Sequence, residues 1–217
     1  MINEAIRPTV LSIKIISNVS HDLAKKLELG PEHKSLGLIT TDVDDVTYTA
    51  LDEATKAAEV EVVYAKSMYA GSANASTKLA GEVIGILAGP SPAEVRSGLN
   101  AALDFMESGS HFTSANDDNS IVYYAYCVSR TGSYLSKVAG VNEGEAIAYL
   151  VAPPLEAVYG LDAALKAADV ELKEFFGPPT ETNFGGALLS GSQSACKAAC
   201  DAFAEAVKSV ANEPRTY

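Results

Sequence analysis

The chain of 217 residues is 47% hydrophobic and 20% charged, a composition typical of a globular protein that buries a sizeable core. Its 28 acidic residues outnumber 16 Lys and Arg residues, and the resulting formal charge of −12 argues against nucleic-acid binding, because neutralising phosphates requires basic side chains. We expect no membrane segment, since the uncharged runs fall well short of the roughly 18 apolar residues of a membrane-spanning helix. The first ten residues lack the features of a secretory signal, which favours a cytosolic protein.

The first half of the chain predicts strands alternating with helices. Runs of apolar and β-branched residues predict strands, and apolar residues spaced three to four apart predict helices. Ser91, Pro92 and Glu94 form an S-x-x-E capping box with Pro at the first helical position, so we expect a helix to start there. In chain order, the elements expected before it are a strand at 9–16, a helix at 20–29, a strand at 35–41, a helix at 46–58 and strands at 59–65 and 82–87.

The second half repeats this order of strands and helices. Its expected elements are a strand at 121–127, a helix at 154–168, strands at 170–176 and 187–189, and an alanine-rich helix at 195–210. Such an order predicts an α/β (α+β) fold in which small sheets are covered by helices.

The two halves are copies of one another. Residues 51–62, LDEATKAAEVEV, return as LDAALKAADVEL at 161–172, with eight of the twelve positions identical at an offset of 110. Farther along the chain the offset contracts by about eight residues. We therefore predict two tandem domains, at 1–110 and 111–217. Two copies favour an internal pseudo-twofold relation or paired half-sites of a larger ring.

Two adjacent carboxylates occur in only one copy. Asp44 and Asp45 precede the first repeated helix, where the second copy has Pro153 and Pro154. Both pairs are good helix starters, so a capping role explains the two aspartates without any ligand. Two carboxylates nevertheless exceed what one cap needs, and a ligand-binding role stays open.

Glu82 is a further charged residue that only one copy has, and two polar loops occupy equivalent places in the two copies. Glu82 begins an apolar strand where the second copy has the uncharged pair Gly185-Gly186, so its carboxylate lies either in water at a strand end or in a cavity. The loops at 67–81 and 177–186 occupy equivalent places and are rich in residues that make mobile connections. They are ordinary surface loops, or they meet at one axis if several copies form a ring.

Metal and cofactor sites are not expected. Three cysteines lack zinc-finger spacing and are interpreted as buried reduced thiols, and the histidines, without a metal-binding pattern, as solvated or capping residues. These residues are Cys127, Cys196, Cys200, His21, His33 and His111.

Four stretches of the chain resemble the ethanolamine-utilisation shell proteins of bacterial microcompartments, of the tandem-domain type called L. The resemblance covers nearly the whole chain. The stretches are SLGLITTDVDDVTYTALDEATKAAEVEVVYAKSMYAGSA, VSRTGSYLS, AYLVAPPLEAVYG and GSQSACKAACDAF.

The resemblance implies a structural protein rather than an enzyme, located in the microcompartment shell. Members of this family carry two circularly permuted microcompartment-shell domains, form homotrimers that look like hexamers, and tile flat sheets with other shell proteins. A central pore with open and closed forms is attributed to the family, and on this basis we expect the loops at 67–79 and 177–184 to meet at the central axis. Three smaller pores, one within each subunit, are expected to bind ethanolamine. Matching the family's ligand contacts to this sequence implies Asp44, Asp45, Glu82, Phe112 and Thr182.

These residue types suit a small amine. Carboxylates neutralise the ammonium group of ethanolamine, an aromatic face attracts it, and a Thr accepts a hydrogen bond from its hydroxyl. Two alternatives remain at this point: an enzyme that uses Asp45 and Glu82 as acid and base, and a cytosolic ligand-sensing regulator. Turnover of an amine would favour the first, and a failure to assemble into sheets would favour the second.

Overall fold

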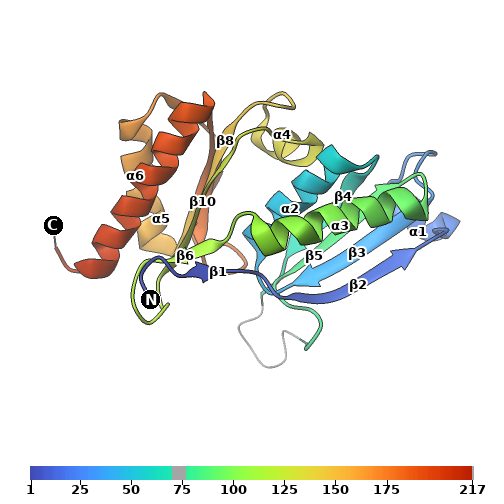
Figure 1. The fold of residues 1–217 in the computed structure, drawn as a ribbon, viewed down its shortest axis with the longest axis horizontal. Coiled ribbons are helices and arrows are strands. Elements are labelled where there is room, and N and C mark those ends of the chain that lie inside the picture. Colours follow the sequence, from blue (N-terminus) through green and yellow to red (C-terminus); the bar gives the residue numbers. More distant parts are fainter. Residues whose placement is uncertain (70–76, 217) are drawn as a thin grey trace. The chain divides into compact units, whose positions relative to one another are not determined.

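The computed structural model describes residues 1–69 and 77–216 and contains two compact units, each built on one antiparallel sheet (Figure 1). The first-repeat unit consists of residues 7–110 together with 132–135. The remaining described residues form the second-repeat unit, which includes the N-terminal residues 1–6. The α/β class expected from the sequence is confirmed, whereas the domain limits of 1–110 and 111–217 stay a prediction.

The first-repeat unit has a four-stranded sheet in the order β2-β3-β5-β4, with α2 and α3 side by side on one face (Figure 1). The core between helices and sheet includes Ile39, Leu51, Leu87, Val95 and Leu99. The elements are β2 (Val10–Ile16), α1 (His21–Lys26), β3 (Ser35–Thr41), α2 (Asp44–Ala57), β4 (Glu61–Ser67), β5 (Val83–Gly89) and α3 (Pro92–Ser108).

The second-repeat unit has a six-stranded sheet in the order β1-β6-β7-β8-β10-β9, covered by α5 and α6. Its core includes Leu150, Leu189, Cys196 and Phe203. The elements are β1 (Ala5–Ile6), β6 (Phe112–Ser114), β7 (Val122–Val128), α4 (Ser133–Ala139), β8 (Ile147–Ala152), α5 (Pro154–Ala167), β9 (Val170–Phe176), β10 (Gly185–Gly191) and α6 (Gln193–Asn212). The first residues of α4 pack in the first-repeat unit, because 132–135 belongs to it.

The internal repeat is visible in the topology. The order β2-β3-β5-β4 in one unit corresponds to β7-β8-β10-β9 in the other. A β-bulge interrupts the pairing of β4 with β5 at Val63, and another interrupts the equivalent pairing of β9 with β10 at Lys173. Because α2 begins at Asp44 and α5 at Pro154, Asp45 corresponds to Leu155, one residue away from the match expected from the sequence.

Several boundaries differ from the expected ones. Helix α2 begins at Asp44 rather than at residue 46, so Asp44 and Asp45 are its first two residues and Val43 is the N-cap. The capping prediction for these aspartates is therefore wrong in its detail. The expected cap at Ser91 is present, since its Oγ accepts the N–H of Glu94 at 3.2 Å. Strand β8 is buried along its whole length, so it shows none of the alternation by which strands are recognised.

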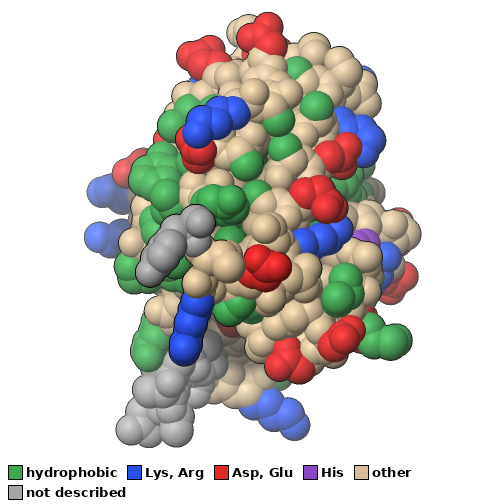
Figure 2. All heavy atoms as spheres, turned by 90° about the vertical axis from the view of Figure 1, so that its left-hand side faces the viewer, with side chains coloured by type: hydrophobic (Ala, Val, Ile, Leu, Met, Phe, Trp, Pro, Cys, Tyr) green, Lys and Arg blue, Asp and Glu red, His purple; other side chains and the backbone are tan. Residues whose placement is uncertain are grey.

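One face of the molecule shows how its charged and hydrophobic side chains are distributed. On the face drawn in Figure 2, acidic, basic and hydrophobic side chains are interspersed, and the described Lys and Arg side chains do not gather there into one patch. Such a face offers no basic track to a phosphate backbone. Among residues 1–69 and 77–216, none of the helices combines the length and apolar character needed to cross a membrane.

Candidate functional site

The first turn of α2 places two buried carboxylates side by side. Asp44 and Asp45 are only 7% and 8% exposed, and the positive end of the helix dipole favours their charge. Asp44 Oδ1 accepts the N–H of Asp45 at 2.9 Å, and its Oδ2 accepts the hydroxyl of Ser67 at 2.7 Å. Asp44 is therefore held between the start of α2 and the end of β4.

Glu82 lies near Asp44, and the glycine that precedes it fixes the path of the chain there. Gly81 has a φ of +64°, and a Cβ at this position would lie 2.0 Å from the carbonyl oxygen of Thr41. The chain thereby approaches β3 closely enough for the N–H of Glu82 to donate to Thr41 O at 2.8 Å. Partial burial raises the pKa of the Glu82 carboxyl to about 7, and the carboxylates of Asp44 and Asp42 add to the effect. Glu82 is thus neither a freely solvated strand end nor fully ionised at neutral pH.

Two tyrosines border the carboxylates. The Tyr48 hydroxyl lies 2.6 Å from Ser67 Oγ, and the centroids of the Tyr48 and Tyr134 rings are 6.2 Å apart. Burial raises the pKa of both phenols, and the nearby aspartates, including Asp45 for each ring, raise it further. The cluster therefore joins negative charge to neutral hydroxyls and aromatic surface, a combination suited to a small organic cation.

Sequence reasoning missed four residues of this cluster, Asp42, Tyr48, Ser67 and Tyr134. Asp42 stands in the same DVDD run as Asp44 and Asp45, so the run itself contained a signal. Tyr134 comes from a segment far along the chain that packs on α2, and no local pattern indicates this contact.

The other two expected ligand residues belong to the second-repeat unit. Phe112 is 5% exposed, and its ring stacks on Tyr124 at 5.4 Å and meets Phe184 edge-on at 5.8 Å. Thr182 is half-buried, and its hydroxyl lies 3.4 Å from that of Thr180. Phe184 connects the two, because it packs on Phe112 and ends the loop that carries Thr182. The structure thus brings together Asp44, Asp45 and Glu82 in one unit, and Phe112 and the Thr182 loop in the other.

The cysteines and histidines differ in part from expectation. The three thiols are free, Cys196 and Cys200 are buried as expected, but Cys127 is only half-buried. Burial raises the pKa of the Cys196 thiol to about 11, which makes it a poor nucleophile. His33 was expected to be a solvated or capping residue but is buried, with Nε2 3.9 Å from a carboxylate oxygen of both Glu32 and Glu61. In the described part of the chain, the His, Cys, Asp and Glu side chains form no group suited to a metal ion.

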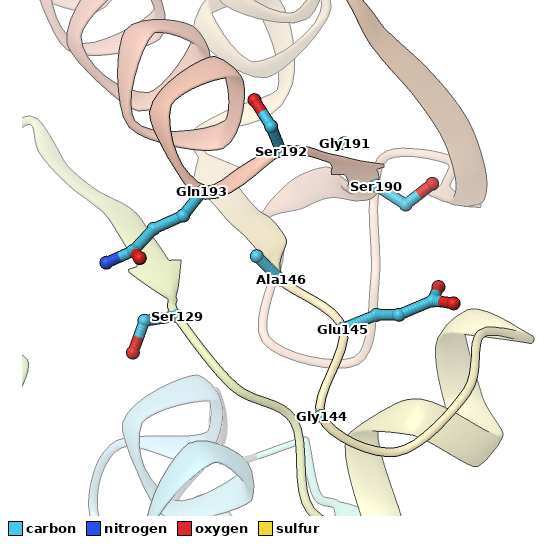
Figure 3. Close-up of a pocket in the computed structure, with 8 residues that line it drawn as sticks. All are labelled: Ser129, Gly144, Glu145, Ala146, Ser190, Gly191, Ser192 and Gln193. Atoms are coloured by element: carbon cyan, nitrogen blue, oxygen red, sulfur yellow. The ribbon is translucent and has the colours of Figure 1, made fainter.

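A separate hollow of about 490 Å³ lies at the start of α6, among the ends of β7, β8 and β10. Its side chains do not converge on a common centre, because Ser129 and Gln193 project to one side and Glu145 and Ser190 to the other (Figure 3). Ligand sites have convergent polar groups. The carboxylate cluster is therefore the better candidate site.

The raised pKa of Glu82 predicts a pH-dependent stability. A carboxyl that holds its proton more tightly in the folded state stabilises the fold at low pH, and this contribution is lost as pH rises from the ordinary value of 4.5 to about 7. The substitution Glu82→Gln removes the charge and keeps the shape. We expect its melting temperature to exceed that of the unchanged chain at pH 8 and to equal it near pH 4, as measured by calorimetry. A difference that does not depend on pH would contradict the assignment.

The two tandem units share one strand order, and only the first of them has the carboxylate cluster. The model of the BMC domain family matches residues 35–116. The identity to curated relatives shows that the chain is a bacterial microcompartment shell protein. The chain is 81% identical to the bacterial microcompartment shell protein EutL of Clostridium perfringens, over 99% of each chain. It belongs to the EutL family.

Solved structures agree with this assignment. The crystal structure of the ethanolamine utilization protein EutL from Leptotrichia buccalis is 66% identical, covers 100% of both chains and has a TM-score of 0.97. The structure of a trimeric bacterial microcompartment shell protein, PduB, is 22% identical over 94% of this chain and 89% of that chain, with a TM-score of 0.75, and shows the similarity of fold alone. The predictions of a structural protein of the microcompartment shell, rather than an enzyme, and of its ethanolamine-utilisation family are confirmed.

Proposed function

We propose that the chain forms pseudohexameric homotrimers in the shell of the ethanolamine-utilisation microcompartment, with small pores that bind and pass ethanolamine and a gated central pore. The observation that carries the ligand assignment is the cluster of Asp44, Asp45 and Glu82, which the second copy of the repeat lacks. A feature that both copies needed for folding would recur in both. The carboxylates therefore serve a purpose beyond the fold.

The chemistry of the cluster fits a small ammonium ion. Burial, together with the carboxylates of Asp44 and Asp42, raises the pKa of Glu82, and a bound cation would relieve this unfavourable electrostatic environment. Binding is expected to be weak, because a ligand of four heavy atoms gains at most ~1.5 kcal/mol per atom. Weak binding suits a passage, since a molecule held tightly would not leave again.

Phe112 and Thr182 enter the proposal from the resemblance alone. The ring of Phe112 is already engaged by Tyr124 and Phe184, so its role would be that of an apolar or cation–π wall. Thr182 would accept a hydrogen bond from the ligand hydroxyl. Both residues stay a prediction.

The central pore is proposed from the equivalent positions of the loops at 67–79 and 177–184. Residues 70–76 of the first loop lie outside the described residues. The second loop is closed by two hydrogen bonds, from the N–H of Thr180 to Phe184 O and from the N–H of Asn183 to Thr180 O. It therefore has a defined shape that a ring of copies would present together.

The trimer predicts a definite mass in solution. Light scattering of the purified chain is expected to give three times its mass of 22.7 kDa. Six repeats would then surround one axis, as two tandem copies in each of three chains require. A stable monomer at micromolar concentration would contradict this part of the proposal.

A further inference from the structure

One face of α5 exposes an apolar surface. Leu155, Val158 and Tyr159 lie on the same side of the helix and are 63%, 50% and 55% exposed. Asp162 follows one turn later on the same side, with its side chain 64% exposed. Adjacent exposed apolar side chains of this size mark interaction sites rather than ordinary surface.

The corresponding face of α2 is covered. The positions 110 residues earlier are Asp45, Tyr48, Thr49 and Asp52, and of these Thr49 and Asp52 are completely buried. The cover is the segment 132–135, which belongs to the same compact unit as α2. Positions that are exposed in α5 are thus buried or half-buried at the equivalent places of α2.

The contact between α2 and its cover is specific. Asp52 Oδ2 accepts the N–H of Gly132 at 2.7 Å, and Oδ1 accepts the N–H of Leu135 at 2.8 Å. Asp52 therefore caps the first turn of α4 from another helix. Thr55 Oγ1 adds a third bond by accepting the N–H of Ser133 at 3.1 Å.

The repeat also identifies the counterpart of the covering segment. Strands β2 and β7, helices α1 and α4, and strands β3 and β8 begin 112 residues apart, so 132–135 corresponds to 20–23. This earlier segment is the start of α1, and it is exposed in the chain. Leu23 is 39% exposed, whereas its counterpart Leu135 is 2% exposed. Each chain thus makes this contact once, between α2 and residues 132–135. The two equivalent surfaces, on α5 and at residues 20–23, are exposed in the same chain.

We infer that the start of α1 in a second copy of this chain docks on α5, with Asp162 accepting the N–H group of Ser20. The N–H of Leu23 is already accepted by Ser20 Oγ at 3.4 Å, a cap that Gly132 cannot provide for α4. This inference rests on the proposed homotrimer and identifies the surfaces that hold it together. The interface joins different patches on the two chains, and such head-to-tail contacts close into rings when the rotation allows.

The differences between the two faces fit this assignment. The contact of α2 with 132–135 forms within one chain, where hydrogen bonds from Asp52 and Thr55 accompany the burial of Leu135. A contact between chains must also offset the lost freedom of two molecules, and burying apolar surface does so. Leu155, Val158 and Tyr159 supply that surface. Ser20 carries a Cβ where Gly132 has none, so α1 must sit slightly farther from α5 than 132–135 does from α2.

The test is a charge reversal with a matched control. Asp162 pairs with Lys166, and Asp201 on α6 pairs with Lys197 at the same spacing, with side chains that are 64% and 67% exposed. In sedimentation velocity over a range of concentrations, we expect Asp162→Arg to weaken the association of chains by roughly ten- to hundredfold, and Asp201→Arg to leave it unchanged. A monomeric unchanged chain would overturn the trimer itself. A trimer that tolerates Asp162→Arg would overturn only the interface.

Cross-linking tests the pairing of surfaces directly. One chain carries Leu23→Cys, a coexpressed chain with a different tag carries Val158→Cys, and both carry Cys127→Ser to remove the half-buried thiol. A short bismaleimide is expected to join the two tagged chains. The control replaces Leu23→Cys by Arg96→Cys on α3 and is expected to give no such product. Absence of the product from the first pair would overturn the inference.

Discussion

Replacing Asp52 by Ala is expected to lower the free energy of unfolding by about 3–5 kcal/mol. The substitution leaves the N–H groups of Gly132 and Leu135 buried without their acceptor, and it removes the partner 3.6 Å from Lys56. Each of these losses is costly because water does not replace the missing carboxylate at a position that is completely buried. The melting temperature should fall by about 10 °C for a chain of this size.

Two variants sharpen this test. Asp52→Asn keeps one acceptor oxygen in place and is expected to lose only part of the stability. Asp104→Ala removes a carboxylate from the exposed face of α3 in the same unit, and we expect almost no change. Calorimetric melting of the three variants measures the effect. If Asp52→Ala melts at the temperature of the Asp104→Ala control, the segment 132–135 is not held by this carboxylate.

Ethanolamine is expected to lose ten- to hundredfold in affinity when Asp45 or Glu82 is replaced by Ala. Each substitution removes a charge-assisted contact worth roughly 1.5–3 kcal/mol. The unchanged chain should bind no more tightly than tens of micromolar, given a ceiling of about −6 kcal/mol for four heavy atoms. Isothermal titration calorimetry measures both values, with Asp104→Ala as the control. Unchanged affinity in both variants would return Asp45 and Glu82 to structural roles.

The protonation of Glu82 adds a second signature to this binding. With a pKa of about 7, part of the carboxyl population is neutral at neutral pH, and an ammonium ion favours the charged form. Binding should therefore release a proton, and affinity should rise between pH 6 and pH 8. Titrations in buffers of different ionisation enthalpy report the released proton directly. The Glu82→Gln variant should bind more weakly and show no such release, whereas a release equal to that of the unchanged chain would exclude Glu82 as its source.

Local patterns determined much of the fold. Strands at 35–41 and 170–176 were expected with the limits that β3 and β9 have, because short runs with apolar residues on one face, set between turn residues, are a local signal for strands. The duplication was readable as well, since LDEATKAAEVEV and LDAALKAADVEL preserve the same helix-to-strand step. Asp44, Asp45 and Glu82 stood out because one copy has them and the other lacks them. A comparison of the chain with itself thus supplied the carboxylates of the candidate site.

Only the tertiary structure decided what surrounds these residues. The raised pKa of Glu82 depends on burial and on Asp44, which lies on another element, and Phe112 is engaged by rings from β7 and the loop before β10. The cover on α2 comes from 132–135, some 80 residues along the chain. Sequence patterns report the local preferences of the backbone, whereas desolvation and close contact depend on which distant segments the fold brings together. For that reason the sequence identified the repeated helix, whereas the structure showed that residues 132–135 cover one face of α2 and that the equivalent face of α5 is exposed.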